Sequence, residues 1–515
     1  MAAAALLFGL SIGAGYALRQ RATKIYEVII VGSGLSGLKC AHDLATKHGF
    51  APDDVLVLEA QDYVGGRVKQ DLTFLPGVKI DLGAEILHGS DTMLNKFAVE
   101  AGEEVEEMFC WAHGDGGPSE HRVNSGYGLY YISGEKGGRL LRFDDGSADF
   151  REANEALWKL ARLNEDDFDE KLTFKDYVDQ EKLSEDMKEM AYAGFSNTLC
   201  TNELDLSLKQ TVRWSRLWNE NGEGDFRFKS SYECLVSYLK RGCEQISINT
   251  VVDEVDYADG HGPVTVRARR ARDSTGGWEN AVYRAKRVVV TASVHVLKSS
   301  MIKFSPPLPR DKVDALDCLE FHRVIKIIVK FKKVVFPRHL GGMIMSGAGC
   351  PVPEVWFRDV SSQVAKQEDG VCYAVGFATS NIADALVQSG SHEDICLAFV
   401  RQLDQVFSHL RPSHVTFGAE VVDDVSALPS PSSQYISGLV QDWRAQHPFI
   451  GGGYGSPRAG RSVYYGAVLA RPVGDKLFFA GEATSCDRPG ATAHSALETG
   501  ARAALELASR RRATG

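Results

Sequence analysis

Three glycines and one acid form the pattern in this sequence that points most directly to chemistry. Gly32, Gly34 and Gly37 follow the apolar run YEVIIV as G-x-G-x-x-G, and Glu59 ends the next apolar run, VLVL. Such glycines let a helix N-terminus approach a pyrophosphate, and an acid about 20 residues later accepts hydrogen bonds from ribose hydroxyls. The pattern predicts an adenine dinucleotide site, but it does not distinguish NAD from FAD.

Lys326 is the strongest candidate for a catalytic side chain. It lies in HRVIKIIVKF, where β-branched neighbours predict a buried strand. A buried lysine is costly unless it is paired or functional. The competing interpretation is a lysine that extends from an edge strand into solvent. Lys330, on the same side of the strand, is the alternative candidate.

The elements that would position these residues can be read along the chain. Residues 26–31 and 55–58 predict two buried strands, and residues 38–47 predict the helix between them. Helical and mixed segments then extend over residues 91–240 and a strand-rich region follows, in which the proline-rich run 305–310 marks a boundary. The chain ends in a strand, a loop and a helix. We therefore expect one domain that is closed by both ends of the chain.

Composition and charge disfavour two classes of partner. The 515 residues carry a formal net charge of −10, which argues against nucleic acid. The 10 cysteines are scattered without metal-ligand spacing. We therefore expect mostly buried thiols and no metal site.

The N-terminus begins with an apolar segment, residues 2–18, of about the minimum length for a membrane span. Arg19, Arg21 and Lys24 follow it, and this order favours a retained anchor with a cytosolic body. A cleaved secretory signal or an organelle presequence is the alternative, and a disordered tail is a third possibility.

Longer blocks at both ends of the chain resemble one family. The blocks GSGLSG, LEA, GGR, DLGAEILHG, DWRAQHPFIGGGYG and LFFAGEATS resemble the flavin-containing amine oxidases, which include monoamine oxidases, polyamine oxidases, histone demethylases and L-amino-acid oxidases. The resemblance implies a two-lobed α/β fold with a Rossmann-type FAD-binding domain and a mixed α/β substrate domain. The implied division is an N-terminal segment at 1–24, FAD-binding parts at 25–95, 235–305 and 465–515, and substrate-domain parts at 96–234 and 306–464.

The resemblance also implies which residues bind FAD. They are Gly32, Gly34, Gly37, Glu59, Gly66, Arg67, Gly83, Ala84, Val251, Trp443, Gly481, Glu482, Thr492 and Ala493. Monoamine oxidases attach their flavin to a cysteine just before the tyrosine of the GGxY segment, where this chain has Gly453. We therefore expect noncovalently bound FAD.

The reaction that the resemblance implies is hydride transfer from the carbon next to an amine nitrogen to the flavin. The resulting imine is hydrolysed to an aldehyde and an amine, and O2 is reduced to H2O2. Lys326 matches a lysine that holds a water at flavin N5, and His88 matches an active-site position. Tyr454 would form one wall of an aromatic cage, and Thr492 stands where the second aromatic wall is expected.

Polyamine oxidases are the subgroup that this chain resembles best, with G-A-x-W-I-H-G against GAEILHG, although Ile86 replaces the tryptophan. Several acids would suit a long polycationic substrate: Glu85, Glu220, Glu223 and Asp225. The simpler interpretation of the last three is a solvated acidic loop. The GAEILHG block lacks the arginine of L-amino-acid oxidases, which weighs against amino-acid substrates.

Three alternatives stay open. The chain could be a monoamine oxidase-like enzyme, a flavin desaturase or porphyrinogen-type oxidase, or an inactive FAD-binding scaffold. The expected partners are a small-molecule amine and O2, and the sequence does not reveal the oligomeric state.

Overall fold

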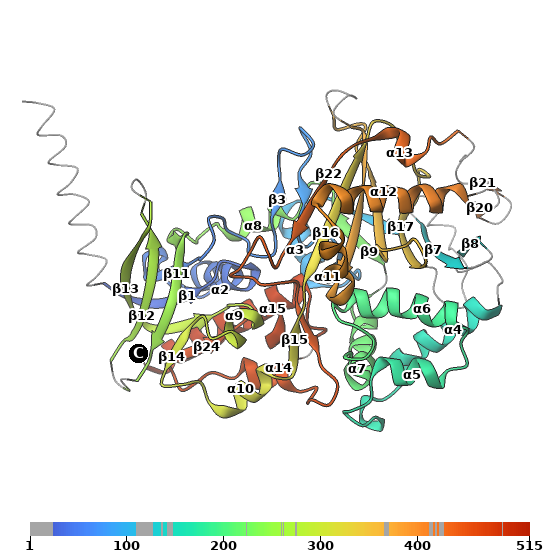
Figure 1. Ribbon diagram of the computed structural model, residues 1–515. Helices are drawn as coiled ribbons and strands as arrows, with labels where there is room; N and C mark the ends of the chain where they lie inside the picture. The colour runs from blue at the N-terminus through green and yellow to red at the C-terminus, as the bar shows by residue number, and fades with distance from the viewer. Residues whose placement is uncertain are drawn as a thin grey trace, which may run out of the picture.

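The protein is described by a computed structural model that covers residues 24–109, 127–134, 137–141, 148–222, 224–258, 260, 262–272, 276–364, 370–410, 416–417, 420–421, 427–486 and 488–514. Two lobes lie side by side, and each contains a large sheet (Figure 1). The first strand of the described chain and its last helix both belong to one lobe, so this lobe is closed by both ends of the chain.

The sheet of this first lobe has the order β10-β2-β1-β13-β12-β11-β14, and β24 also pairs with β13. Its parallel part consists of β1 (Ile25–Val31), β2 (Val55–Leu58), β10 (Ile246–Ser247), the end of β13 (Trp278–Val290) and β24 (Leu477–Phe479). An antiparallel extension consists of β11 (Thr250–Asp256), β12 (Val264–Ala271) and the start of β13, with β14 (Lys303–Ser305) at the edge.

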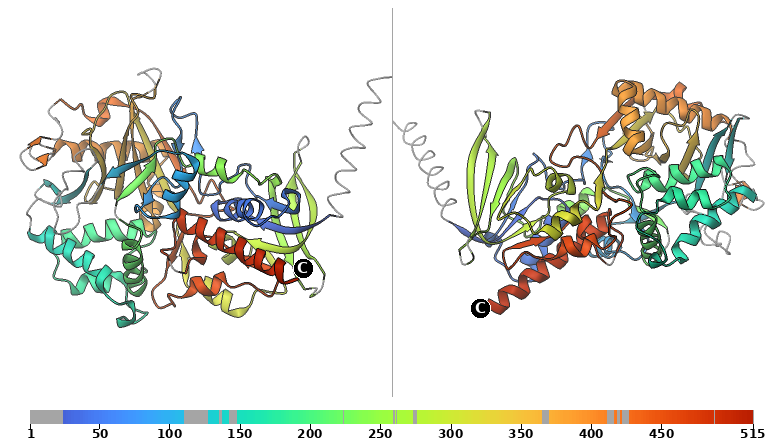
Figure 2. Two further views of the ribbon diagram at one scale, coloured as in Figure 1. Left: turned by 180° about the vertical axis from the view of Figure 1, so that it is seen from behind. Right: turned by 60° about the horizontal axis from the view of Figure 1, so that its bottom comes forward.

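Apolar side chains on both faces of β1 explain why this strand is central. Val28 and Ile30 pack against helix α2 (Leu35–Thr46) and helix α15 (Ala493–Thr514), which lie side by side (Figure 2). Ile29, on the opposite face, packs in a second cluster with side chains of β11, β12 and β13. A strand that is covered on both faces is expected to be a nearly continuous apolar run.

The second lobe contains a seven-stranded sheet of order β22-β16-β19-β18-β17-β7-β8. The strands are β22 (Tyr435–Asp442), β16 (Val324–Phe331), β19 (Cys372–Thr379), β18 (Glu354–Asp359), β17 (Leu340–Gly347), β7 (Tyr127–Gly134) and β8 (Gly137–Leu141). Helices α11 (Ser380–Ser389) and α12 (His392–Ser408) pack on one face of this sheet. The opposite face contributes Trp356 and Tyr373 to a cluster that also contains Trp443.

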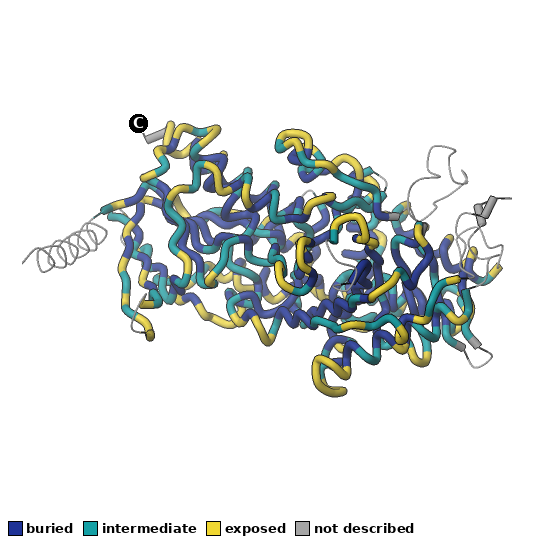
Figure 3. Tube along the Cα trace, turned by 90° about the horizontal axis from the view of Figure 1, so that it is seen from above, coloured by how far each residue is buried: buried dark blue, intermediate teal, exposed yellow. Residues whose placement is uncertain are grey.

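Helices complete the second lobe below this sheet in Figure 1. They are α4 (Ala148–Lys159), α5 (Phe174–Gln180), α6 (Glu185–Ala191), a π-helical turn at Tyr192–Ser196 and α7 (Leu208–Asn219). In Figure 3 the buried parts of the chain form the interior of both lobes and continue through the junction between them.

Shorter elements complete the two lobes and the segments between them. The helices are α3 (Met93–Ala101), α8 (Glu233–Leu239), α9 (Val294–Lys298), α10 (Arg310–Leu316), α13 (Pro431–Gln434) and α14 (Tyr465–Ala470). The strands are β3 (Gln70–Asp71), β4 (Ile80–Asp81), β5 (Leu87–His88), β6 (Val105–Phe109), β9 (Asp225–Phe228), β15 (Leu319–Phe321), β20 (Thr416–Phe417), β21 (Glu420–Val421) and β23 (Gly455–Pro457).

The structure confirms the two-lobed α/β fold that the sequence predicted. The predicted strands at 26–31 and 55–58 are β1 and β2, and the helix between them begins at Leu35. The strand that carries Lys326 is buried, as the β-branched pattern predicted. β16 pairs with β19 on one side and with β22 on the other, which excludes the alternative of an edge strand.

The predicted N-terminal membrane anchor lies outside the described residues, which begin at Lys24. Within the described part of the chain, no helix combines the length and the hydropathy that a bilayer span requires. The membrane location and the cellular compartment therefore stay predictions.

Candidate functional site

A cavity of about 340 Å³ lies between the two lobes. Its lining comes from the glycine turn after β1, the end of β2, the segment 82–88, the strands of the second sheet and the segment around Gly481. Because residues from both ends of the chain and from both sheets meet there, this cavity brings together most of the predicted site residues.

The glycine turn forms one end of this cavity. Gly32 has φ +107°, and a Cβ atom at Gly37 would lie 2.1 Å from the Gly32 carbonyl oxygen, so only glycine allows α2 to begin this close to β1. A Cβ atom at Gly34 would have no atom within 4 Å, which shows open space beside the helix N-terminus. No side chain caps α2, so its first N–H groups are available to a phosphate.

Glu59 is held at the same end of the cavity. Its Oε2 accepts hydrogen bonds from the Ser33 N–H and the Ser33 hydroxyl, each at 2.7 Å, and its Oε1 accepts one from the Gln61 N–H at 2.8 Å. Burial raises the pKa of the Glu59 carboxyl, and these hydrogen bonds oppose that rise. Val251, on β11, lines the cavity nearby. This end therefore fits the adenosine half of a dinucleotide.

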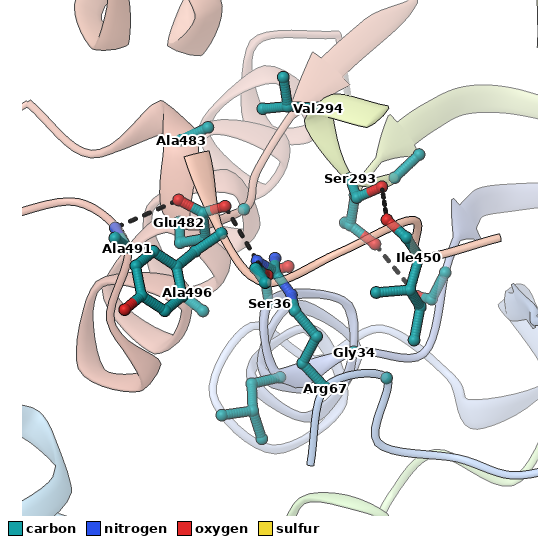
Figure 4. A pocket seen from close by; sticks show the side chains of 18 of the residues that line it. Gly34, Ser36, Arg67, Ser293, Val294, Ile450, Glu482, Ala483, Ala491 and Ala496 are labelled. Atoms are coloured by element: carbon teal, nitrogen blue, oxygen red, sulfur yellow. Dashed lines mark hydrogen bonds and ion pairs between the residues drawn. The ribbon is translucent and has the colours of Figure 1, made fainter. Parts of the chain in front are cut away.

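Arg67 and Glu482 link two segments that are far apart in the sequence (Figure 4). The Arg67 guanidinium donates to Glu482 Oε1 at 3.1 Å and to the Gly453 carbonyl oxygen at 2.7 Å. Glu482 also accepts hydrogen bonds from the Gly455 and Ala491 N–H groups, each at 3.2 Å. Both side chains are fixed where a ribityl or phosphate group of a cofactor would pass.

Backbone packs very closely along the middle of the cavity. A Cβ atom at Gly83 would lie 1.8 Å from the Arg67 carbonyl oxygen, and the Trp443 indole donates to the Leu82 carbonyl oxygen at 3.1 Å. A Cβ atom at Gly481, which has φ +135°, would have no atom within 4 Å. Small residues thus keep this part of the cavity open for a flat group, and Gly66 and Ala84 line it too.

The start of α15 closes this part of the cavity, and Thr492 and Ala493 both line it. The family resemblance implied that both residues bind FAD, and a backbone N–H group would be the natural donor at a helix start. The Thr492 N–H instead donates to the Ser495 hydroxyl at 3.3 Å, as part of the turn that begins the helix. The N-terminal end of α15 nevertheless points its partial positive charge toward the cavity lining.

Lys326 lies on β16, its side chain is 3% exposed, and it lines the cavity. Its ammonium donates to the Glu85 Oε2 and to the Asp81 carbonyl oxygen, each at 2.7 Å, and it lies 5.1 Å from the Trp356 ring centroid. Lys330 instead donates to the Phe74 carbonyl oxygen, away from the cavity. Of the two candidate lysines, the structure places Lys326 in the site.

Glu85, which the sequence predicted as a substrate-binding acid, lines the cavity and is paired with Lys326 there. Its side chain is 4% exposed, and its carboxylate pairs with Lys326 because the buried ammonium needs a counter-ion. Burial alone would raise the pKa of the Glu85 carboxyl, but Lys326, Arg358 and Arg227 together hold it below its ordinary value. Burial and the neighbouring Glu85 charge raise the pKa of Asp81 to about 7.

His88 lines the other end of the cavity, next to the indole ring of Trp218 at a centroid distance of 4.9 Å. Its Nδ1 lies 2.7 Å from Asp225 Oδ1. Burial alone would lower the pKa of the imidazole, but Asp225 raises it above its ordinary value. Asp225 therefore acts on His88 and is not itself part of the lining.

Glu220, another of the predicted substrate acids, is exposed at the end of α7 and does not line the cavity. The predicted Glu223 lies outside the described residues. Tyr454 does line the cavity, and its hydroxyl donates to the Thr198 carbonyl oxygen.

Glu354 is a cavity residue that the sequence reasoning missed. It begins β18, and its Oε2 accepts hydrogen bonds from the Thr198 hydroxyl at 3.1 Å and from the Asn197 amide at 3.2 Å. Burial raises the pKa of the Glu354 carboxyl to about 7. The only local signal is an acid at the start of the apolar run EVWF, and this signal does not distinguish a cavity residue from a surface residue.

The aromatic side chains around Glu354 come from several elements. Trp218, Trp356, Phe377 and Tyr454 all line the cavity with it. Together with His88 and Glu354 they form a part of the lining that we call the aromatic compartment. Within the described residues, no cluster of histidine, cysteine and acidic side chains is arranged to hold a metal ion.

Comparisons with known proteins agree with this arrangement. The model of a protein family described as "Flavin containing amine oxidoreductase" matches residues 35–508. The chain is 26% identical to polyamine oxidase 3 of Oryza sativa subsp. japonica, covering 95% of this chain and 90% of that protein. It is 24% identical to a lysine-specific histone demethylase 1 homologue of Arabidopsis thaliana, covering 93% of this chain but only 30% of that protein.

A solved structure shows that the fold is shared. Putrescine oxidase bound to putrescine superimposes with a TM-score of 0.70 at 20% identity, covering 95% of this chain and all of that chain. Since the family match extends over nearly the whole chain, this protein belongs to the flavin-containing amine oxidoreductase family.

Proposed function

We propose that this protein is an FAD-dependent oxidase that acts on amines with a second cationic nitrogen, such as polyamines, and uses O2 as the electron acceptor. In this reaction the amine becomes an imine, water cleaves the imine to an aldehyde and an amine, and O2 leaves as H2O2. The observation that carries the substrate preference is the Glu354 carboxylate in an otherwise aromatic compartment of the cavity.

FAD, when bound, supplies the hydride acceptor and later passes the electrons to O2. Gly34, Glu59 and Arg67 would hold its adenosine and phosphate groups, since they line the glycine-rich end of the cavity. A noncovalent complex is supported by Gly453, where a Cβ atom would lie 2.2 Å from Val324 Cγ2 and leaves no room for a cysteine side chain.

The aromatic compartment would bind and orient the amine. Trp356, Phe377 and Tyr454 exclude water from the reacting carbon, and desolvation favours the neutral amine that the reaction requires. Glu354 would hold a second, protonated nitrogen by a charge-assisted hydrogen bond. The name of the plant relative, a polyamine oxidase, supports the same substrate class.

The test is anaerobic stopped-flow reduction of the flavin-loaded protein. Spermine, spermidine, their acetylated forms, tyramine, benzylamine and several L-amino acids would be mixed with it in turn, and the loss of oxidised-flavin absorbance followed. We expect polyamines to bleach the flavin fast. When air is admitted, the oxidised-flavin absorbance should return and H2O2 should be released. Bleaching by tyramine or benzylamine alone would favour the monoamine oxidase-like alternative.

If none of these amines bleached a fully loaded flavin, the proposal would be refuted. In that case reduction of the flavin by a compound that donates hydride from a carbon atom without an amine would favour the desaturase or porphyrinogen-type alternative. A flavin that no substrate reduces would favour the inactive scaffold.

A further inference from the structure

The contact between Glu85 and Lys326 is a buried ion pair inside the cavity. Both side chains are at most 4% exposed, and the ammonium and the carboxylate oxygen are 2.7 Å apart. Removing one partner of such a pair leaves an uncompensated buried charge. The pair therefore determines the charge that Lys326 can carry in the cavity.

Glu85 is held rigidly by its surroundings. The Ala84 N–H donates to the Arg67 carbonyl oxygen at 3.2 Å, and the Tyr232 hydroxyl donates to the Ile86 carbonyl oxygen at 3.0 Å. The backbone on both sides of Glu85 is thus fixed, so its carboxylate is presented to Lys326 in one position.

The geometry also leaves Lys326 one donor for the cavity. An ammonium group has three N–H donors. The Asp81 carbonyl oxygen and Glu85 take two of them. Since Lys326 lines the cavity, the third can act on a water or on O2 there.

Other charged and titratable groups face the pair from the surrounding elements. They are Asp81 on β4, Arg227 on β9, Arg358 on β18 and Tyr373 on β19. Lys326 and the two arginines act on the Glu85 carboxyl group and favour its charged form.

We propose that Glu85 is a positioning residue that holds the Lys326 ammonium in one position and directs it into the cavity, and that this pair sets how fast the reduced protein reacts with O2. The proposal rests on the proposed function, in which the electrons leave to O2. A fixed positive charge next to the reacting centre stabilises the negative charge that develops as O2 accepts the first electron.

The experiment bypasses the amine. The flavin-loaded full-length protein is reduced with dithionite without air and mixed with O2-containing buffer, and the return of oxidised-flavin absorbance is followed. The variants are Glu85→Gln, Glu85→Asp, Lys326→Met and the double variant Glu85→Gln/Lys326→Met. Lys330→Met is the matched control, because it removes a cation from the same strand outside the cavity.

We expect wild type to be reoxidised fast, and Lys326→Met and the double variant to be slow and equal to each other. Glu85→Gln should be at least about tenfold slower than wild type, because a neutral amide does not hold the ammonium in the position that the carboxylate fixes. Glu85→Asp keeps the negative charge and should recover part of the rate. Lys330→Met should match wild type.

A second measurement reports on the charge without turnover. The midpoint potential of the bound flavin, measured by equilibration with a reference dye, should be higher in Glu85→Gln than in wild type but close to wild type in Glu85→Asp, because only the first change removes a negative charge. A merely structural role of Glu85 would not separate the two variants in this way.

The proposal would be overturned if Glu85→Gln matched wild type in both measurements, or if the double variant were slower than Lys326→Met, because Glu85 would then act without the lysine. If Glu85→Gln does not fold, Glu85→Asp decides, because a rate as slow as that of Lys326→Met would contradict a role for the carboxylate charge. Failure of every amine to bleach the flavin would refute the proposed function and leave this measurement intact.

Discussion

Replacing Glu354 by glutamine tests the substrate preference most directly. The change keeps the size of the side chain and can keep the hydrogen bonds from Thr198 and Asn197, but it removes the negative charge from the aromatic compartment. We expect the variant to bind diamines and polyamines more weakly, and to treat monoamines of the same chain length as wild type does.

The size of the effect follows from the position of the carboxylate. Truncating one partner of a buried, hydrogen-bonded charge pair costs about 2–5 kcal/mol. Glu354 is only partly buried, so we take the lower end, about 2–3 kcal/mol, and this corresponds to about a 30- to 140-fold rise in KM for a diamine.

The assay follows H2O2 release by wild type and by Glu354→Gln, with putrescine and with butylamine as substrates. KM and kcat are determined for each pair between pH 6 and pH 9. Since burial raises the pKa of Glu354 to about 7, its carboxyl group is mostly protonated and neutral below that pH and mostly charged above it. The wild-type KM for putrescine should therefore fall as the pH rises through 7, relative to that of the variant. Equal losses for both amines would refute the reasoning, because they would show that Glu354 supports the fold of the cavity instead of holding a second nitrogen.

Three further predictions concern the cofactor. Gly37→Ala would place a Cβ atom 2.1 Å from the Gly32 carbonyl oxygen, so the purified variant should contain little flavin, as measured by the ratio of flavin to protein absorbance, and full loading would contradict the assigned turn. Acid precipitation of wild type should leave all flavin in the supernatant. The added side chain in Gly453→Cys would clash with Val324, so this variant should lose about 1–3 kcal/mol of stability and gain no covalent flavin. A yellow pellet from either protein would show covalently bound flavin and contradict this prediction. Glu482→Gln removes the charge that pairs with Arg67, so the Kd for FAD, followed by fluorescence quenching, should change at least about tenfold, whereas an unchanged Kd would exclude Glu482 from the cofactor site.

Much of the first lobe could be predicted from local sequence. The glycine turn is readable because Gly37 packs against the Gly32 carbonyl oxygen, a contact that a Cβ atom forbids. Residues 26–31 and 55–58 are readable as strands because apolar residues without a break suit a sheet that is covered on both faces. Steric and periodic constraints of this kind act between neighbours in the chain.

The arrangement of charges in the cavity could not be predicted in this way. Lys326 and Glu85 are 241 positions apart, and Glu354 and Asn197 are 157 positions apart. Whether Glu85 faces a substrate or a lysine depends on how β16 packs against the segment 82–88, and no local pattern records that packing. Glu354 was missed for the same reason, since an acid before an apolar strand is common on protein surfaces.

By itself, the sequence determined that a dinucleotide turn, a buried lysine-bearing strand and a closing helix exist, because glycine sterics and apolar periodicity are local properties. It also carried the family blocks at both ends of the chain. Only the tertiary structure decided that β16 is an inner strand, that Lys326 is paired with Glu85, and that Glu354 is the carboxylate of the aromatic compartment. Buried charges are placed by the packing of elements that are distant in the chain, and their partners become visible only when those elements meet.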